Sequence, residues 1–357
     1  MKKIYILLFT IILFNSCVED IPVGFLSDNI RMREDTMEVV KGLYVVSGIP
    51  MIDGSTQPLK FEILRVKDLN TGKDAPEFFK NYSVKLWKSP YNPDMDSTME
   101  LVNKKLYAKE VPPIEINPGS GQIAFNGGTQ YIDGELYGVD IKVSNESDSK
   151  EYTNYGKIKF VYRPWEDANN FGEWIYGIVA SEPGKNYTIE NRNPLPPDEK
   201  VQVHNNTHPR FHIEKVAERD DVKIKLTFYD CNDNPFPGKA INREPSGSSY
   251  RNSWFDNSIE TEYLDDGVIF NFPTVPYPIY GRQDPGGGRN SISLSYYQLH
   301  PSYYTVTDEA QALADEFAAR EGLTFSGINL HVKIVYQINE PGEWHVKVKF
   351  RHAKIKK

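Results

Sequence analysis

The chain has 357 residues, a formal net charge of -8, 13% aromatic residues and only two cysteines. The acidic balance excludes a nucleic-acid partner bound through its phosphates, which needs a basic stripe, and two cysteines exclude a disulfide framework. The length is sufficient for two domains with separate cores.

The first residues have the layout of a secretory signal peptide. Lys2 and Lys3 give a positive start, and residues 4–14 form an apolar run that ends shortly before Cys17. This run is about eleven residues long, too short for a membrane helix, which needs about 20. A cleaved signal peptide is therefore predicted over residues 1–17.

The end of this signal resembles the bacterial lipobox, in which the cysteine becomes the acylated N-terminus. Leu13-Phe14-Asn15-Ser16-Cys17 carries the resemblance, although Asn15 replaces the usual small residue. The alternative is an ordinary signal in which Cys17 is incidental. Glu19 and Asp20 resemble the surface-export signal of Bacteroidetes lipoproteins. The resemblance implies a lipid anchor at Cys17 in the outer membrane, with the protein facing the cell exterior.

Residues 18–38 show no clear periodicity and predict a tether. Residues 39–163 contain short alternating segments about ten residues apart, which is typical of an antiparallel β-sandwich. The clearest predicted strands cover residues 61–66, 82–87, 114–116, 122–125, 137–143 and 158–162. The stretch 121–160 resembles the closing half of an immunoglobulin- or cadherin-like domain. We therefore predict one such domain over 39–163.

Residues 164–357 predict a second β-rich domain that carries one helix. Strands are expected at residues 211–213, 222–228 and 268–272, and segments 332–338 and 346–350 predict a terminal hairpin. A helix is predicted over about 307–321, because Thr307 is a natural N-cap and Gly322 a natural stop. The predicted fold class is mostly β, with two antiparallel β-sandwich-type domains.

The patterns that could bind a metal fail on their details. Three histidines have helical spacing: His204, His208 and His212. Pro209 lies among them, so no helix is expected to gather the imidazoles. The segment Asp230–Asn234 has the oxygen spacing of a calcium loop, but Pro235 replaces the required glycine, and a hairpin tip is expected instead. We predict no metal and no cofactor.

Catalytic motifs are not found in the sequence. No nucleophile elbow is present, the glycine-rich stretch 281–288 lacks the Gly-Lys-Ser/Thr of a phosphate loop, and Cys231 reads as a packed thiol. A glycosidase needs only a carboxylate pair, whose separation the sequence does not give. The available carboxylates are Glu166, Asp167, Glu173, Asp265 and Asp266, of which the last two are better explained as a turn.

Clustered aromatic side chains in loop-like context are the strongest binding signal. Sugar rings pack their C–H faces on tryptophan and tyrosine, while neighbouring polar groups bind the hydroxyls. The candidate ligand-binding residues are Trp165, Trp174, Tyr176, Trp254, Tyr280 and Tyr297. The alternative assigns these rings to the core.

Three stretches of the first domain resemble a family of uncharacterised Bacteroidetes surface lipoproteins, a domain of unknown function. They are Ser47–Glu62, Asn70–Glu77 and Leu101–Leu106. The resemblance implies an association with starch-utilisation-type systems, in which glycan is captured beside a TonB-dependent importer. It supplies no catalytic motif, and a shared fold does not establish a function.

We therefore predict a non-catalytic cell-surface lipoprotein that binds a poly- or oligosaccharide as an accessory of a polysaccharide-utilisation system. Its expected partners are the lipid bilayer, reached through Cys17, a glycan, and outer-membrane importer components. The first alternative is an adhesin or assembly subunit that presents strand edges to another protein. The second is a glycoside hydrolase with a carboxylate pair.

Overall fold

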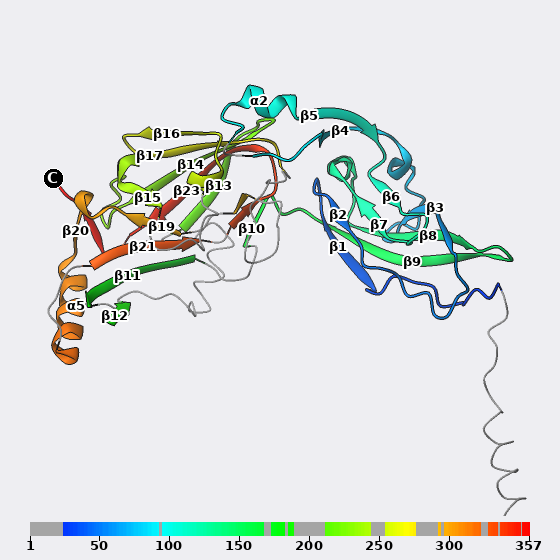
Figure 1. The fold of residues 1–357 in the computed structure, drawn as a ribbon, viewed down its shortest axis with the longest axis horizontal. Coiled ribbons are helices and arrows are strands. Elements are labelled where there is room, and N and C mark those ends of the chain that lie inside the picture. Colours follow the sequence, from blue (N-terminus) through cyan, green and yellow to red (C-terminus); the bar gives the residue numbers. More distant parts are fainter. Residues whose placement is uncertain are drawn as a thin grey trace, which may run out of the picture. The chain divides into compact units, whose positions relative to one another are not determined.

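The computed structural model describes residues 24–92, 95–167, 173–182, 185–188, 211–243, 254–275, 292–293, 296–322, 328–334, 336–350 and 352–357. They form two compact units (Figure 1). Unit 1 contains the residues up to Val84 and Glu110–Tyr162, and unit 2 contains Lys85–Lys109 and the residues from Arg163 onward. Strands dominate both units, so the predicted mostly-β, sandwich-type fold class is confirmed.

Unit 1 contains a four-stranded and a three-stranded sheet. The first has the order β1-β9-β8-β3 and the second β2-β7-β6. The pairing is antiparallel except between β1 and β9, which run parallel. The elements are β1 (Thr36–Val40), β2 (Val45–Val46), β3 (Lys60–Asp68), η1 (Pro76–Phe79), β6 (Ile114–Ile116), β7 (Ile123–Phe125), η2 (Gly127–Tyr131), β8 (Leu136–Ser144) and β9 (Ser149–Val161).

The core of unit 1 takes residues from both sheets, as a sandwich requires. Phe160 of β9 lies near its centre, and its ring centroid is 5.8 Å from those of Phe78, Phe125 and Tyr137. All four side chains are buried. Phe125 belongs to the three-stranded sheet and Phe160 to the other, so these rings join the two layers.

The predicted tether over 18–38 is wrong from Phe25 onward. Leu26, Ile30 and Met32 are buried in the core of unit 1, and residues 36–40 form β1. Two hydrogen bonds fix the backbone of this segment: the Tyr152 hydroxyl donates to the Ser27 carbonyl at 2.6 Å, and Met32 N donates to the Tyr155 carbonyl at 2.8 Å. The apolar residues follow neither strand nor helix spacing, which is why periodicity did not reveal them.

Unit 2 contains two five-stranded sheets with the orders β13-β23-β14-β17-β16 and β12-β11-β21-β19-β15. The smaller sheets are β10-β22-β18 and β20-β24. The strands are β10 (Trp165–Asp167), β11 (Glu173–Glu182), β12 (Lys185–Thr188), β13 (Phe211–Ala217), β14 (Val222–Tyr229), β15 (Ile241–Arg243), β16 (Glu260–Leu264), β17 (Gly267–Phe272), β18 (Ile292–Ser293), β19 (Tyr296–Leu299), β20 (Tyr304–Val306), β21 (Ile328–Ile334), β22 (Tyr336–Ile338), β23 (Gly342–Lys349) and β24 (Ala353–Ile355). The helical elements outside the insertion described below are η3 (Gly238–Ala240), α4 (Trp254–Asn257), η4 (Pro301–Tyr303) and α5 (Asp308–Glu321).

The core of unit 2 lies between its two large sheets. Along β23, every second residue is buried, and Trp344, Val346 and Val348 are at most 1% exposed. Phe228 of the same sheet packs edge-on against Tyr297 of the other, with ring centroids 6.5 Å apart. The alternation of apolar and polar residues in the sequence of β23 therefore matches the alternation of buried and partly exposed side chains in the strand.

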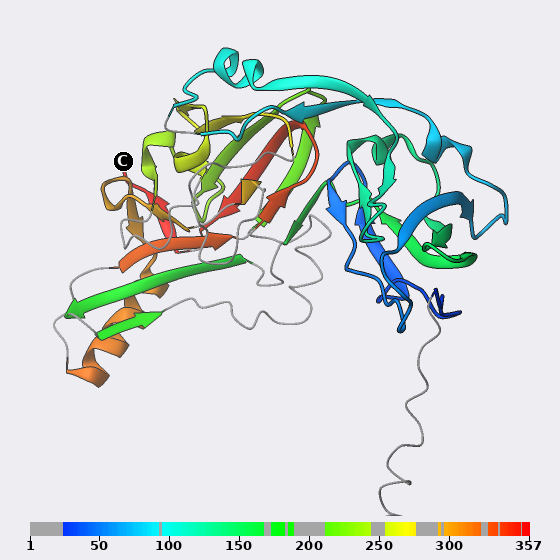
Figure 2. The ribbon, with the colours of Figure 1, turned by 45° about the vertical axis from the view of Figure 1, so that its right-hand side comes forward.

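Helix α5 confirms the prediction over about 307–321. The Thr307 hydroxyl accepts a hydrogen bond from Ala310 N at 3.3 Å, and Gly322 ends the helix with a left-handed φ of 63°. Ala310 and Ala314 are fully buried in the core of unit 2. The helix lies beside the ends of β11 and β12 in both ribbon views (Figures 1 and 2).

The predicted terminal hairpin is wrong, although its strands exist. Strands β21 and β22 pair within the sheets of β11 and β10, whereas β23 pairs with β13 and β14. The connection between β22 and β23 thus crosses from one sheet to another. Asn339 fixes this crossing, because its backbone N–H donates to the Pro164 carbonyl at 2.9 Å and its side chain donates to the Arg163 carbonyl at 3.1 Å.

Candidate functional site

An insertion, residues 85–109, belongs to unit 2 and not to the predicted domain 39–163. It includes the end of β4 (Tyr82–Trp87), α2 (Met99–Lys104) and the start of β5 (Leu106–Val111). Tyr91 and Val102 are fully buried in the core of unit 2. The Tyr91 hydroxyl donates to the Asn257 carbonyl at 2.9 Å. The sequence gives no sign of this assignment, because the two residues pack against strands more than 100 positions away.

Local hydrogen bonds hold α2 in the insertion. The Thr98 hydroxyl accepts from Leu101 N at 3.3 Å and caps the helix. The Asp96 carboxylate, 6% exposed, accepts from the Lys105 ammonium at 2.6 Å and from Asn92 N at 2.7 Å. The helix is therefore fixed at both ends, and its inward side chain, Val102, reaches the core.

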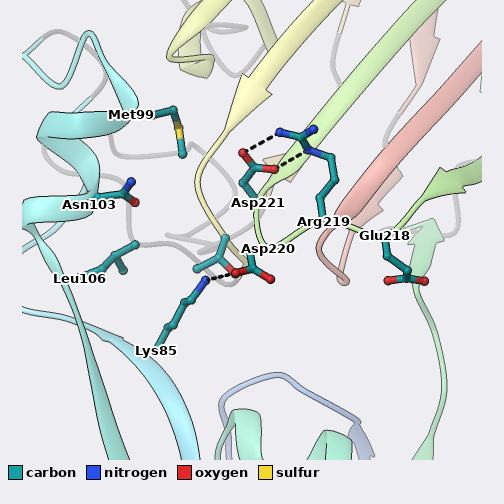
Figure 3. Close-up of a pocket in the computed structure, with 9 residues that line it drawn as sticks. Lys85, Met99, Asn103, Leu106, Glu218, Arg219, Asp220 and Asp221 are labelled. Carbon is teal, nitrogen blue, oxygen red and sulfur yellow. Dashed lines mark hydrogen bonds and ion pairs between the residues drawn. The ribbon is translucent and has the colours of Figure 1, made fainter.

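A pocket of about 460 Å³ separates α2 from the turn 218–221 between β13 and β14 (Figure 3). Met99 and Leu106 give it an apolar wall on the insertion side, and Asn103 adds an amide. Figure 3 shows Lys85, from β4, extending from below toward Asp220 of the turn on the other side. All of these residues belong to unit 2.

Ion pairs shape the opposite side of the pocket. The Arg219 guanidinium donates to both oxygens of Asp221, at 2.6 and 3.1 Å, and this hydrogen bonding raises the pKa of Arg219 above its usual value. The Lys85 ammonium lies 3.3 Å from the Asp220 carboxylate. The side chain of Asp220 is 95% exposed, so its oxygens remain accessible to a ligand.

The pocket combines the features of a site for a small polar ligand. Its volume falls within the range of about 300–1,000 Å³ that is usual for such sites. Met99 and Leu106 offer apolar surface, while Asn103 can both donate and accept hydrogen bonds and Asp220 accepts them. Sequence reasoning missed these residues. The only local signal was the run of four charged residues at 218–221, which resembles any solvated turn.

The structure does not bring the predicted aromatic residues together in a described site. Trp165 lies in β10, half-buried against the core of unit 2. The backbones of Trp174 and Tyr176 lie in β11 and that of Trp254 begins α4, but their side chains lie outside the description. Tyr280 also lies outside the described residues.

Tyr297 is a correction to the predicted ligand-binding set. Its side chain is 0% exposed, and its ring contacts Phe228 and Phe255 in the core of unit 2. Tyr297 lies in β19, where strand alternation points it inward. The ring therefore packs between the sheets and offers no surface to a ligand.

The other residues weighed in the sequence have structural positions. Glu166 and Asp167 lie in β10, Glu173 begins β11, and Asp265 and Asp266 form the turn from β16 to β17, as expected. His212 lies in β13, as its strand pattern predicted, whereas His204 and His208 fall outside the described residues. Cys231 is a free, half-buried thiol.

The segment Asp230–Asn234 is the predicted hairpin tip. The Asp230 carboxylate accepts hydrogen bonds from the backbone N–H groups of Asn232, Asn234 and Ile355, at 2.8 to 3.2 Å. Burial raises the pKa of Asp230, but these donors outweigh it and hold the pKa below its usual value. The oxygen spacing that resembles a calcium loop thus serves the turn itself.

A polar cluster lies on the sheet of β13, β14 and β23. The Glu214 carboxylate accepts from the Lys347 ammonium at 2.5 Å and lies 3.1 Å from His212 Nε2, and these two hydrogen bonds lower the pKa of Glu214 to about 2. Thr227 Oγ1 lies 3.0 Å from His345 Nε2. Within the described part of the chain, no three acidic, histidine or cysteine side chains are placed to hold a metal ion.

His345 predicts a stability loss in mild acid. Burial, followed by the charges of Lys347 and Lys225, lowers the pKa of His345 to about 4. The unfolded chain protonates this group near pH 6.5 and the folded chain does not. The stabilising contribution is therefore complete above pH 6.5 and is lost as the pH falls toward 4.

Between pH 7 and pH 5 this linkage should remove about 2 kcal/mol from the free energy of unfolding of unit 2. Urea unfolding followed by tryptophan fluorescence at the two pH values measures the change. His345→Gln removes the titrating group and should flatten the dependence. An equally steep slope in the variant would assign the loss to other groups.

The anchor residue Cys17 lies outside the described residues. Across the part that the structure does describe, none of the helices has the length and apolar character of a membrane span.

No protein-family model and no curated protein matches the chain. Among solved structures, a SusE-like surface located polysaccharide binding protein from the heparin utilisation locus of Bacteroides thetaiotaomicron aligns at 10% identity, over 90% of this chain and 53% of its own, with a TM-score of 0.24. An endo-fucoidan hydrolase of glycoside hydrolase family 107 aligns at 8% identity, over 92% and 30%, with a TM-score of 0.19. A protocadherin gammaB7 structure aligns at 9% identity, over 90% of this chain and 73% of its own, with a TM-score of 0.20.

The chain thus spans about half of the first structure and under a third of the second. All three TM-scores are too low to carry an argument about fold or function.

Proposed function

We propose that the chain is a non-catalytic lipoprotein of the bacterial cell surface, anchored by acylated Cys17, and that unit 2 binds a glycan in the pocket between α2 and the turn 218–221. The observation that carries the proposal is the composition of this pocket. It places an apolar wall with an adjacent amide opposite an accessible carboxylate within one unit.

Sugars have the chemistry that this arrangement can recognise. A pyranose ring presents C–H groups that pack on Met99 and Leu106, and its hydroxyls both donate and accept hydrogen bonds. Asn103 can satisfy both roles through its amide, and Asp220 accepts from paired hydroxyls. Lys85 lies beside Asp220 and can donate to the same sugar.

The charge of the pocket favours a neutral glycan over a sulfated one. Both cations of the lining are already engaged within the pocket, Lys85 by Asp220 and Arg219 by Asp221. Glu218 also lines the pocket, and its carboxylate is paired with Lys215 at 2.6 Å. A sulfate group would approach exposed carboxylates and would have to compete for paired cations.

The location and the partners of the protein rest on the sequence. The lipobox at Cys17 and the acidic residues that follow it support an outer-membrane anchor that faces the exterior. The resemblance of stretches within residues 47–106 to surface lipoproteins supports an accessory role in a polysaccharide-utilisation system, beside importer components. A non-catalytic role fits the lack of a catalytic motif in the sequence.

Calorimetry against a panel of neutral, uronic and sulfated polysaccharides tests the binding. We expect at least one neutral polysaccharide to bind, and Asn103→Ala and Asp220→Ala each to weaken that binding about 10-fold, because each removes direct hydrogen bonds to the sugar. The Lys85–Asp220 pair is exposed, so its loss should change stability by less than about 1 kcal/mol.

Glu262→Ala is the matched control, since Glu262 is an exposed carboxylate on the edge strand β16 of the same unit and does not line the pocket. Its affinity should equal that of the unmodified chain. Failure of every polysaccharide to bind would reject the glycan function. Binding that neither pocket variant weakens would reject this site.

A further inference from the structure

The folded part of unit 1 begins very close to the lipobox. Six residues, 18–23, separate Cys17 from Gly24, the first described residue. The Phe25 carbonyl accepts from Thr56 N at 2.8 Å, and the Leu26 carbonyl accepts from the Lys150 ammonium at 2.6 Å. An extended chain covers at most about 3.6 Å per residue, so seven steps span at most about 25 Å. The fold itself therefore starts within that distance of the acylated residue.

This first segment lies against a second one, and together they form what we call the N-terminal ledge, residues 25–31 and 49–56. Backbone hydrogen bonds join Arg31 and Met51 in both directions, at 3.2 and 2.9 Å. Ser27 N donates to the Ser55 hydroxyl at 3.0 Å. These bonds join the two segments of the ledge to each other. The Tyr152 hydroxyl of β9, which donates to the Ser27 carbonyl at 2.6 Å, joins the ledge to the rest of unit 1.

Three apolar side chains of the ledge face solvent. Phe25 is 38% exposed, Ile49 63% and Met51 41%. Two carboxylates of the ledge have partners within unit 1. Asp53 accepts from the Ser27 hydroxyl at 2.7 Å, and Asp28, whose side chain is 91% exposed, pairs with Lys150 at 2.9 Å. These contacts reduce the cost of bringing the ledge to a surface of lower polarity.

We propose that the N-terminal ledge rests on the lipid bilayer, with Phe25, Ile49 and Met51 in the headgroup region. The inference rests on the acylation of Cys17 that the proposed function includes. A chain link of at most about 25 Å holds the ledge at a high effective concentration near the lipid, so weak apolar contacts are sufficient. This contact would hold unit 1 in a defined orientation relative to the bilayer.

Site-specific fluorescence on the full acylated protein tests the contact. In a Cys231→Ser background, Ile49→Cys takes an environment-sensitive nitrobenzoxadiazole label. The control is Leu64→Cys, an apolar position on β3 of unit 1 that is 39% exposed. The protein is reconstituted in vesicles of phosphatidylethanolamine and phosphatidylglycerol that carry spin-labelled lipid. We expect quenching at position 49 to be at least threefold stronger than at position 64.

Lengthening the link separates membrane contact from other causes of shielding. A flexible linker of about 20 glycine and serine residues is inserted after Asp20. It should reduce the quenching at position 49 by half or more, because the effective concentration of the ledge near the lipid falls. Equal quenching at positions 49 and 64 would overturn the inference. Shielding of position 49 that persists in detergent without vesicles would also overturn it, by indicating a protein contact.

Mass spectrometry of the mature N-terminus keeps this test distinct from that of the proposed function. An unmodified Cys17 would remove the anchor and with it both proposals. An acylated Cys17 combined with a water-exposed label at position 49 would overturn the ledge contact alone and leave the anchored, glycan-binding protein intact.

Discussion

Urea unfolding of the chain that lacks residues 1–17 should give two transitions, and tryptophan fluorescence should report only the one that belongs to unit 2. All the tryptophans lie in the sequence of unit 2: Trp87, Trp165, Trp174, Trp254 and Trp344. Most of the buried apolar residues of the described chain fall into two clusters without a common member, one for each unit. Separate cores predict separate cooperative units.

A matched pair of core substitutions assigns the two transitions. Phe228→Ala empties a fully buried position in unit 2, where the ring packs on Tyr297 and Phe350, and Phe160→Ala does the same in unit 1. Each should lower the free energy of unfolding of its own unit by about 3–5 kcal/mol. Phe228→Ala should shift the transition that fluorescence reports, which circular dichroism also detects. Phe160→Ala should shift the other circular-dichroism transition and leave the fluorescence transition unchanged.

The opposite result has a clear signature. If both substitutions moved fluorescence and circular dichroism together in a single transition, the two clusters would unfold as one cooperative unit. The test is demanding because the chain crosses between the units three times. It enters unit 2 at Lys85, returns to unit 1 at Glu110 and enters unit 2 again at Arg163.

Alternation and capping are local, and they predicted the elements well. Residues 137–143 alternate in the sequence and lie in β8, where Tyr137, Val139, Ile141 and Val143 are all buried. Thr307 and Gly322 predicted both ends of α5. In each case the deciding contact lies within a few residues of the signal, so one sequence contains it.

The errors concern partners that are distant in the chain. Residues 85–109 lie between predicted strands of the first domain, 39–163, and so are predicted to belong to it, yet Val102 packs among strands that come much later. Strands β22 and β23 looked like a hairpin because they are consecutive, yet they pair in different sheets. Strand pairing is chosen by the whole core, and neighbouring position in the sequence is only a weak guide to it.

The candidate site could not have been predicted for a related reason. A pocket is a property of two surfaces, and Asn103 and Asp220 carry no motif until the fold places α2 opposite the turn 218–221. Aromatic content pointed to Tyr297 instead, but tyrosine serves a core as readily as a binding surface, and this one is buried. Composition alone does not separate the two uses.

Asp140 is the residue on which we expect the stability of unit 1 to depend most among its polar groups. Its side chain is 4% exposed in β8, and the carboxylate accepts from Arg65 Nε at 2.5 Å and from Asn154 N at 2.8 Å. The pairing of β8 shifts register beside it on both sides, and Asn154 has a φ of 53°. The carboxylate therefore binds the backbone of β9 at a β-bulge, where the regular pairing of β8 and β9 is interrupted.

Asp140→Ala should lower the free energy of unfolding of unit 1 by about 3 kcal/mol at pH 7. It leaves the Asn154 N–H without its acceptor and the Arg65 guanidinium without its carboxylate. Asp140→Asn keeps an acceptor oxygen and should lose about half as much. Circular dichroism in urea measures both losses, and the tryptophan signal of unit 2 should not move.

Asp35→Ala provides the control, because Asp35 also pairs with a lysine of unit 1, Lys157 at 3.3 Å, but is 84% exposed. Its removal should cost less than about 1 kcal/mol, since water replaces an exposed partner at little loss.

Burial raises the pKa of Asp140, but the hydrogen bonds from Asn154 N–H and Arg65 outweigh it and lower the pKa below its usual value. Its contribution is therefore present above about pH 4 and is lost as the pH falls through the lowered pKa, a loss that Asp140→Ala should abolish. Equal costs for Asp35→Ala and Asp140→Ala would show that the bulge holds its shape without the buried carboxylate.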